Sequence, residues 1–127
     1  MKKLFPLLLL LIYAGCDDTT TNVDSNVIPD SNVSYSKHIQ PIFNAKCVNC
    51  HGVGQTDAGL DLTTWAGTTA NPSVVFPGKP ENSNLVFTIE QTSGFPPMPP
   101  VDSPYPPLTQ NQINGVKTWI KEGAKNN

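Results

Sequence analysis

The feature that most constrains this chain is the pentapeptide Cys-Val-Asn-Cys-His at residues 47–51. Two thiols at this spacing on one helical turn can each add to a vinyl group of the same porphyrin, and the adjacent histidine then presents its imidazole to the iron. The spacing is the sequence signature of c-type haem attachment. It predicts one covalently bound haem c, with thioether links at Cys47 and Cys50 and with His51 as the proximal iron ligand.

Three other interpretations of the pentapeptide are weaker. A thioredoxin-like redox pair would need a βαβ setting, and the flanking residues show no such alternation. A structural zinc site would need a second pair of ligands, and the only other histidine is the isolated His38. A disulfide between Cys47 and Cys50 would close a strained short loop. Haem attachment is therefore favoured.

Residues 1–15 are typical of a bacterial export signal. Two lysines precede an apolar run at residues 4–14, which is shorter than the roughly 20 residues of a membrane-spanning helix. The small residues directly before Cys16 resemble the lipobox of bacterial lipoproteins, although Tyr13 stands where leucine is usual. We expect cleavage before Cys16 and lipidation of its thiol, with plain secretion or an uncleaved anchor as alternatives.

A polar stretch without periodicity follows the expected lipidation site. It offers no apolar face that could offset the entropy of ordering it, so residues 16–33 are predicted to be the lipidated cysteine and a flexible tether. The alternative is that a part of it, such as Val27 to Pro29, packs on the domain. The folded domain is expected at residues 34–127. The protein is expected in the cell envelope of a bacterium, exported and anchored by lipid to a membrane.

The residues before the pentapeptide have helical periodicity. Apolar side chains recur at spacings of three and four from Ile39 to Phe43. A helix that starts near His38 or Ile39 would place Pro41 in its first turn, where the missing N–H has no partner to lose.

A second helix is predicted near the C-terminus. Thr109 and Gln112 have the spacing of a capping box, and Gly123 is a natural residue to follow the last turn. The apolar stripe between them is formed by Ile113, Val116 and Ile120. Gly115 inside this helix costs about 1 kcal/mol relative to alanine unless a close crossing by the first helix uses its missing side chain. The alternative is a tolerated surface glycine.

Apart from the initiator, Met98 is the only methionine, and it lies in Gly-Phe-Pro-Pro-Met-Pro-Pro at residues 94–100. Prolines fix φ near −65° and favour polyproline II, so this loop presents Met98 on a stiff backbone. A thioether held in this way suits the distal iron position, and Met/His ligation raises the reduction potential relative to two imidazoles. The alternative is a proline-rich recognition segment with Met98 as ordinary packing. His38 is the rival iron ligand, although it more simply caps its helix or faces solvent.

Composition narrows the function further. Charged residues make up 14% of the chain and the formal net charge is −2, so there is no basic stripe to neutralise phosphates and no nucleic-acid partner is expected. Much of the apolar content lies in residues 4–14. The remainder therefore needs the haem to complete its core.

The motifs, taken in order, resemble class I cytochrome c domains, most closely the planctomycete-type cytochrome c domain. The resemblance covers roughly residues 35 to 125, and its segments lie at 39–43, 47–52, 59–62, 77–83, 98–100 and 119–124. It implies an all-α fold in which the N- and C-terminal helices cross around one haem, with a short helix after Pro80. It also implies thioether links at Cys47 and Cys50, with His51 proximal and Met98 distal. The stretch from Thr63 to Pro77 has no strong signal of its own, and Trp65 within it either lines the haem or one of its propionates, or simply packs.

Function follows from the expected ligands. Iron with two protein ligands has no open position, so we expect a carrier of single electrons between redox partner proteins of an electron-transport chain. No small-molecule substrate is expected. One alternative is a haem enzyme or gas sensor in which Met98 is displaced. Another is a non-redox lipoprotein whose haem only completes the core.

Overall fold

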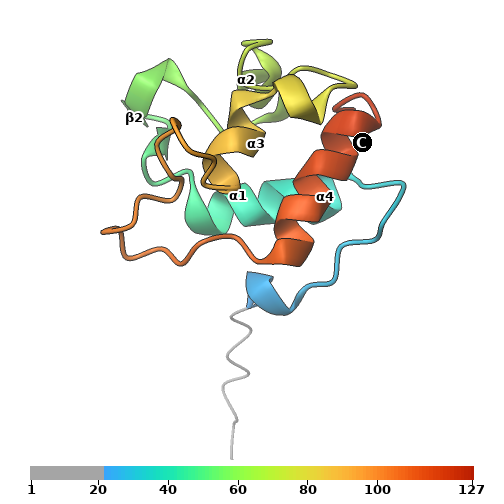
Figure 1. Ribbon diagram of the computed structural model, residues 1–127, viewed down its shortest axis with the longest axis horizontal. Coiled ribbons are helices and arrows are strands. Elements are labelled where there is room, and N and C mark those ends of the chain that lie inside the picture. Colours follow the sequence, from blue (N-terminus) through green and yellow to red (C-terminus); the bar gives the residue numbers. More distant parts are fainter. Residues whose placement is uncertain (1–21) are drawn as a thin grey trace, which may run out of the picture.

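The computed structural model describes residues 22–127, which form a mainly helical domain with one small hairpin (Figure 1). The expected export signal, Cys16 and the first residues of the predicted tether lie outside the described residues. The elements in chain order are η1 (Val23–Ser25), η2 (Tyr35–Ile39), α1 (Gln40–Lys46), β1 (His51–Gly52), β2 (Gln55–Thr56), η3 (Asp57–Gly59), α2 (Trp65–Thr69), η4 (Pro80–Asn82), α3 (Asn84–Ile89) and α4 (Gln110–Lys121). Within this range no helix combines the length and hydropathy needed to cross a bilayer.

The first long helix consists of two parts with different winding. The wide π-helical turn η2 leads directly into α1, so the helix begins several residues before the predicted start near His38. Ser34 caps it by accepting a hydrogen bond from the N–H of Lys37 at 3.2 Å. Pro41 lies in the first turn of α1, as predicted. A proline ring crowds the carbonyl four residues before it, and a wider turn directly ahead relieves that crowding.

The C-terminal helix α4 begins with the predicted capping box. The N–H of Gln112 donates to Oγ1 of Thr109 at 3.3 Å, and the N–H of Thr109 donates to Oε1 of Gln112 at 3.0 Å. Gly123, at φ +101°, follows the last turn as expected. The short helix expected after Pro80 is α3, which buries Leu85, Val86 and Ile89.

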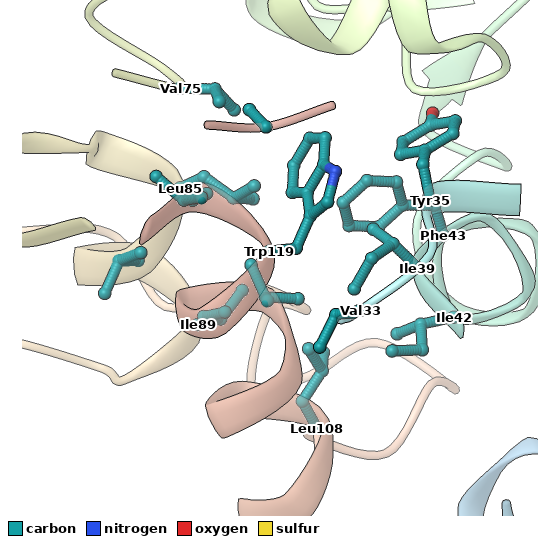
Figure 2. Packing of buried hydrophobic residues seen from close by; sticks show 14 of the residues in the cluster. Val33, Tyr35, Ile39, Ile42, Phe43, Val75, Leu85, Ile89, Leu108 and Trp119 are labelled. Atoms are coloured by element: carbon teal, nitrogen blue, oxygen red, sulfur yellow. The ribbon is translucent and has the colours of Figure 1, made fainter. Parts of the chain in front are cut away.

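Trp119 of α4 lies at the centre of the core and is fully buried. Figure 2 shows it between α3, which contributes Leu85 and Ile89, and the first helix, which contributes Tyr35 and Phe43. The rings of Tyr35 and Trp119 are 5.2 Å apart between centroids. The indole N–H donates to the carbonyl of residue 125 at 2.9 Å, so the polar atom of this large side chain is satisfied. The core therefore joins α4, α3 and the first helix.

Residues 22–33, which we call the strap, pack on the domain beside α4 (Figure 1). Ile28 is 4% exposed and Val33 is 1% exposed. The prediction of a flexible tether is therefore wrong for the strap, and the alternative of local packing holds, although Val27 itself faces solvent. A Cβ on Gly115 would lie 2.7 Å from Cγ2 of Ile28. The strap, rather than the first helix, thus occupies the space that this glycine leaves.

Polar side chains of α4 and of the residue after it hold the backbone of the strap. The amide of Asn111 accepts from the N–H of Ile28 at 2.8 Å and donates to its carbonyl at 3.0 Å. The carboxylate of Glu122 accepts from the N–H groups of Asn32 at 2.6 Å and Val33 at 2.9 Å. These bonds satisfy backbone groups that no strand or helix pairs, which is how a polar segment becomes ordered.

The stretch without a strong signal contains α2, which is too short to show periodicity. Thr64 caps it by accepting from the N–H of Gly67 at 3.1 Å. Trp65, its first residue, donates its indole N–H to the carbonyl of Ala124 at 2.7 Å. Of the roles left open for this tryptophan, the structure shows packing against the core, with this bond to the C-terminal segment.

Candidate functional site

The pentapeptide at residues 47–51 begins where α1 ends. Cys47 is the residue after the last helical turn, and its N–H donates to the carbonyl of Phe43 at 2.8 Å. The N–H groups of Cys50 and His51 both donate to the carbonyl of Cys47, at 3.1 and 2.9 Å. The motif therefore wraps tightly around one carbonyl and starts at the residue that caps the end of the helix.

Gly52 permits this turn. It is buried, and a Cβ in its place would lie 2.3 Å from the carbonyl oxygen of Val48. It also pairs with Gln55 in the β1–β2 hairpin. Since the clash would be with backbone rather than with a flexible side chain, no other residue fits directly after the motif without moving it.

The imidazole of His51 is held in one tautomer. Its Nδ1 lies 3.0 Å from the carbonyl oxygen of Asp57. A carbonyl only accepts, so Nδ1 carries the hydrogen and Nε2 keeps its lone pair. Metal-binding histidines are oriented by this kind of bond. The side chain is therefore prepared to coordinate a metal through Nε2.

Both cysteines of the motif are free thiols in the structure. Burial raises the pKa of the Cys47 thiol to about 12. A thiol in this state stays protonated at neutral pH and is a poor partner for disulfide exchange.

Two cavities of about 140 and 180 Å³ share Cys47, His51, Ala58 and Met98 in their walls, and we call them together the cleft. The first cavity also reaches Cys50, so the structure brings together all four side chains for which the sequence predicts contact with haem. The walls of the second are mostly apolar and include Leu60, Leu62, Val74, Leu85 and Ile89.

The donor set fits a c-type haem. Two thiols are available for covalent links, an imidazole nitrogen and a thioether sulfur are available for iron, and apolar walls suit a macrocycle. In residues 22–127 every buried side-chain nitrogen or oxygen has a hydrogen-bond partner. The cleft thus contains no orphaned polar group that would oppose an apolar ligand.

The backbone of Met98 is fixed to α3. Its N–H donates to the carbonyl of Thr88 at 3.1 Å. His38, the rival ligand, lines neither cavity of the cleft. Its Nδ1 instead accepts from the N–H of Ser34 at 2.9 Å, which is the capping role considered for it.

Lys46 is a residue of the cleft that sequence reasoning missed. It is 5% exposed, directly precedes the motif and lines the first cavity. Its Nζ pairs with the carboxylate of Asp24 at 2.6 Å and donates to the carbonyl of Pro107 at 2.9 Å. The hydrogen bond from Lys46 lowers the pKa of Asp24. Nothing local in the sequence marks this pair, since its members lie on the strap and on α1.

The loop that follows Met98 also closes on the motif. Ser103 and Tyr105 line the first cavity, and the amide of Asn49 donates to the hydroxyl of Tyr105. Sequence reasoning predicted a stiff proline-rich segment at residues 94–100, but it did not predict that the next residues return to the pentapeptide. This loop forms the cleft wall beside Cys50.

The remaining interpretations of the motif find no support in the part of the chain that the structure describes. Residues 22–127 contain no group of three or more histidine, cysteine, aspartate or glutamate side chains placed to hold a metal ion. The sheet there is one antiparallel hairpin of two-residue strands, so the βαβ setting of a thioredoxin-like pair is missing.

Comparison with protein families gives one match. Residues 47–102 match the family described as Planctomycete cytochrome C. The matched range begins at the first cysteine of the motif and ends beyond Met98. No curated protein and no solved structure matches the chain. The match indicates a haem-based role in electron transfer.

Proposed function

Because residues 47–102 match the family described as Planctomycete cytochrome C, we propose that this protein carries single electrons on one haem c. In this proposal Cys47 and Cys50 hold the haem by thioether bonds, His51 is the proximal ligand and Met98 is the distal ligand. The bound haem would supply reversible one-electron exchange at its iron. The observation that carries the proposal is that all four side chains line one largely apolar cleft.

The residues of the cleft each have a definite task in this proposal. The bond from Nδ1–H of His51 to the carbonyl of Asp57 orients the imidazole and makes Nε2 more basic. The thioether of Met98 is a soft donor that favours the reduced state relative to a second imidazole. The apolar walls exclude water, which also favours the state with the lower charge. Two protein ligands leave no position for a substrate.

We further propose the class I arrangement of the fold, in which the first helix and α4 cross around the haem. The supporting contacts are those of Tyr35 on the first helix with Trp119 on α4, with ring centroids 5.2 Å apart. The hairpin β1–β2 is an addition to the all-α expectation, and it serves to carry His51.

The cellular setting is proposed from the sequence. An export signal at residues 1–15, lipidation of Cys16 and attachment to a membrane of the bacterial cell envelope would place the domain among redox partner proteins. Cys16→Ser separates the anchor from the domain. The variant should leave the membrane fraction and keep its haem spectrum, whereas an unchanged membrane fraction would argue against lipidation at this residue.

The function is tested by optical spectra of the chain coexpressed with haem-attachment machinery. We expect a low-spin spectrum, a sharp reduced α-band and the weak red band of methionine-ligated ferric haem. Met98→Ala should lose that red band and lower the potential, while His38→Ala, the matched control, should change neither. A high-spin spectrum, or ready binding of carbon monoxide by the reduced wild type, would instead favour a haem enzyme or gas sensor.

A further inference from the structure

The chain between α3 and Met98 folds back onto the helix it has just left. The N–H of Thr92 donates to the carbonyl of Phe87 at 2.9 Å, and the N–H of Phe95 donates to the carbonyl of Thr92 at 3.1 Å. The rings of Phe87 and Phe95 then meet, with centroids 4.7 Å apart and planes inclined by 36°. Aromatic pairs with centroids at this separation attract each other beyond the area they bury. The loop is therefore fastened to α3 just ahead of the methionine.

From this contact we infer that Phe95 is a positioning residue for Met98 and acts through its stacking on Phe87. The inference rests on the proposed function, because it requires Met98 to be an iron ligand. Phe95 lines neither cavity of the cleft, so its effect on the thioether must pass through the backbone.

The two residues between Phe95 and Met98 form a stiff link, so the backbone positions of Phe95 and Met98 are coupled. They are Pro96 and Pro97, whose rings hold φ near −65° and remove the freedom that would absorb a displacement. Pro96 lines the second cavity, so the rigid piece runs along the cleft wall. A shift of the Phe95 ring therefore becomes a shift of the methionine.

The residue on the other side of Phe95 gives the loop freedom. Gly94 has a φ of +91°, and a Cβ there would meet nothing within 4 Å. Without the aromatic pair, the loop would pivot at this glycine. Two backbone bonds would then hold it without the rings, from the N–H of Met98 to the carbonyl of Thr88 and from the N–H of Phe95 to the carbonyl of Thr92, each at 3.1 Å. The iron–thioether bond competes with other ligands, so looser positioning raises the share of molecules in which the methionine has left.

Phe95→Leu in the haem-loaded protein tests the inference, with Phe76→Leu as a matched control. Phe76 is 39% exposed, lies under the ammonium of Lys79 and lines neither cavity of the cleft. Carbon monoxide binds only molecules whose methionine has dissociated, so a tenfold rise in that population raises its apparent affinity about tenfold. We expect Phe95→Leu to show this rise, a weaker red band and a lower potential, with haem content unchanged. The control should match the wild type.

Two further variants make the outcome decisive. Phe95→Tyr keeps the ring and should restore the wild-type spectrum. Phe87→Leu removes the other ring of the pair and should reproduce the effect of Phe95→Leu. If Phe95→Leu yields no haem-loaded protein, Phe87→Leu serves as the test in its place. A wild type without the red band would refute Met98 ligation itself. A wild type with the band, together with a Phe95→Leu protein of unchanged band and carbon monoxide affinity, would overturn the positioning role alone.

Discussion

Gly115→Ala should have different effects on stability in two backgrounds, because one side chain of the strap fills the space beside this glycine. The new Cβ would lie 2.7 Å from Cγ2 and 2.8 Å from Cδ1 of Ile28, well inside carbon–carbon contact distance. Replacing a glycine inside a helix by alanine stabilises the folded state by about 1 kcal/mol when nothing obstructs the new Cβ. Overpacking of this kind costs about 1–3 kcal/mol. We therefore expect Gly115→Ala alone to be neutral or to destabilise by about 2 kcal/mol.

The second background removes the obstruction. Ile28→Ala deletes a buried side chain and should cost about 2 kcal/mol, near the lower end for such truncations because the strap lies at the edge of the domain. In this background Cγ2 and Cδ1 of residue 28 are gone and only its Cβ remains, 3.2 Å from the Cβ of residue 115, so Gly115→Ala should stabilise by up to about 1 kcal/mol. The resulting coupling of about 1–3 kcal/mol is large enough to measure in a double-mutant cycle.

Thermal unfolding of the haem-loaded protein is the assay, because about 1 kcal/mol shifts Tm by roughly 4–8 °C in a domain of this size. Asn114→Ala, on the exposed neighbour of Gly115 in α4, is the matched control and should have the same effect in both backgrounds. If Gly115→Ala stabilises equally with and without Ile28, the two residues do not share one space. The strap would then contribute nothing to the packing of α4.

Three other perturbations test the site and its surroundings. Cys47→Ala with Cys50→Ala should leave the chain without haem and largely unfolded, since a small domain with few large aliphatics relies on the ligand for stability. A cooperative melt near that of the haem-loaded protein would contradict this. The hydrogen bond from Lys46 holds the pKa of Asp24 below its ordinary value of 3.8. The ionised carboxylate therefore stabilises the folded state fully above pH 3.8, and this contribution is lost as the pH falls through the lowered pKa. Urea titrations should show that Asp24→Asn lowers the free energy of unfolding by about 1 kcal/mol at neutral pH and leaves it unchanged in strong acid. Gly52→Ala should cost about 3 kcal/mol or more and sharply reduce the yield of haem-loaded protein, measured by its α-band.

Local patterns predicted the parts of this fold that depend on neighbouring residues. The capping box of Thr109 and Gln112 involves residues three apart, and both of its hydrogen bonds are present. The periodicity that ends at Phe43 predicted α1, although not the wide turn that precedes it. The attachment motif and the methionine loop each predicted chemistry from a few adjacent residues. The structure brings the two segments together in one cleft.

The features that sequence reasoning missed depend on contacts between distant residues. Asn111 holds the backbone of Ile28 across 83 positions, and Glu122 holds that of Val33 across 89. Each of these polar side chains would look solvent-facing on a helix, and the strap has no periodicity of its own. Lys46 was missed for the same reason, because its partners lie on the strap and in the loop after Met98. Pairs of this kind leave no local pattern to find.

The strap also sets how far the haem could travel from a membrane. Only five residues, 17–21, separate Cys16 from the strap, so the chain between the proposed lipid and the domain spans at most about 20 Å when fully extended. With Cys16 lipidated as proposed, a connection of that length would confine the domain to a thin layer above the bilayer. Asp24 of the strap pairs with Lys46, which lines the cleft where the haem would be held. Electron exchange would then take place within that layer, and a freely diffusing partner would have to come to the membrane to take part.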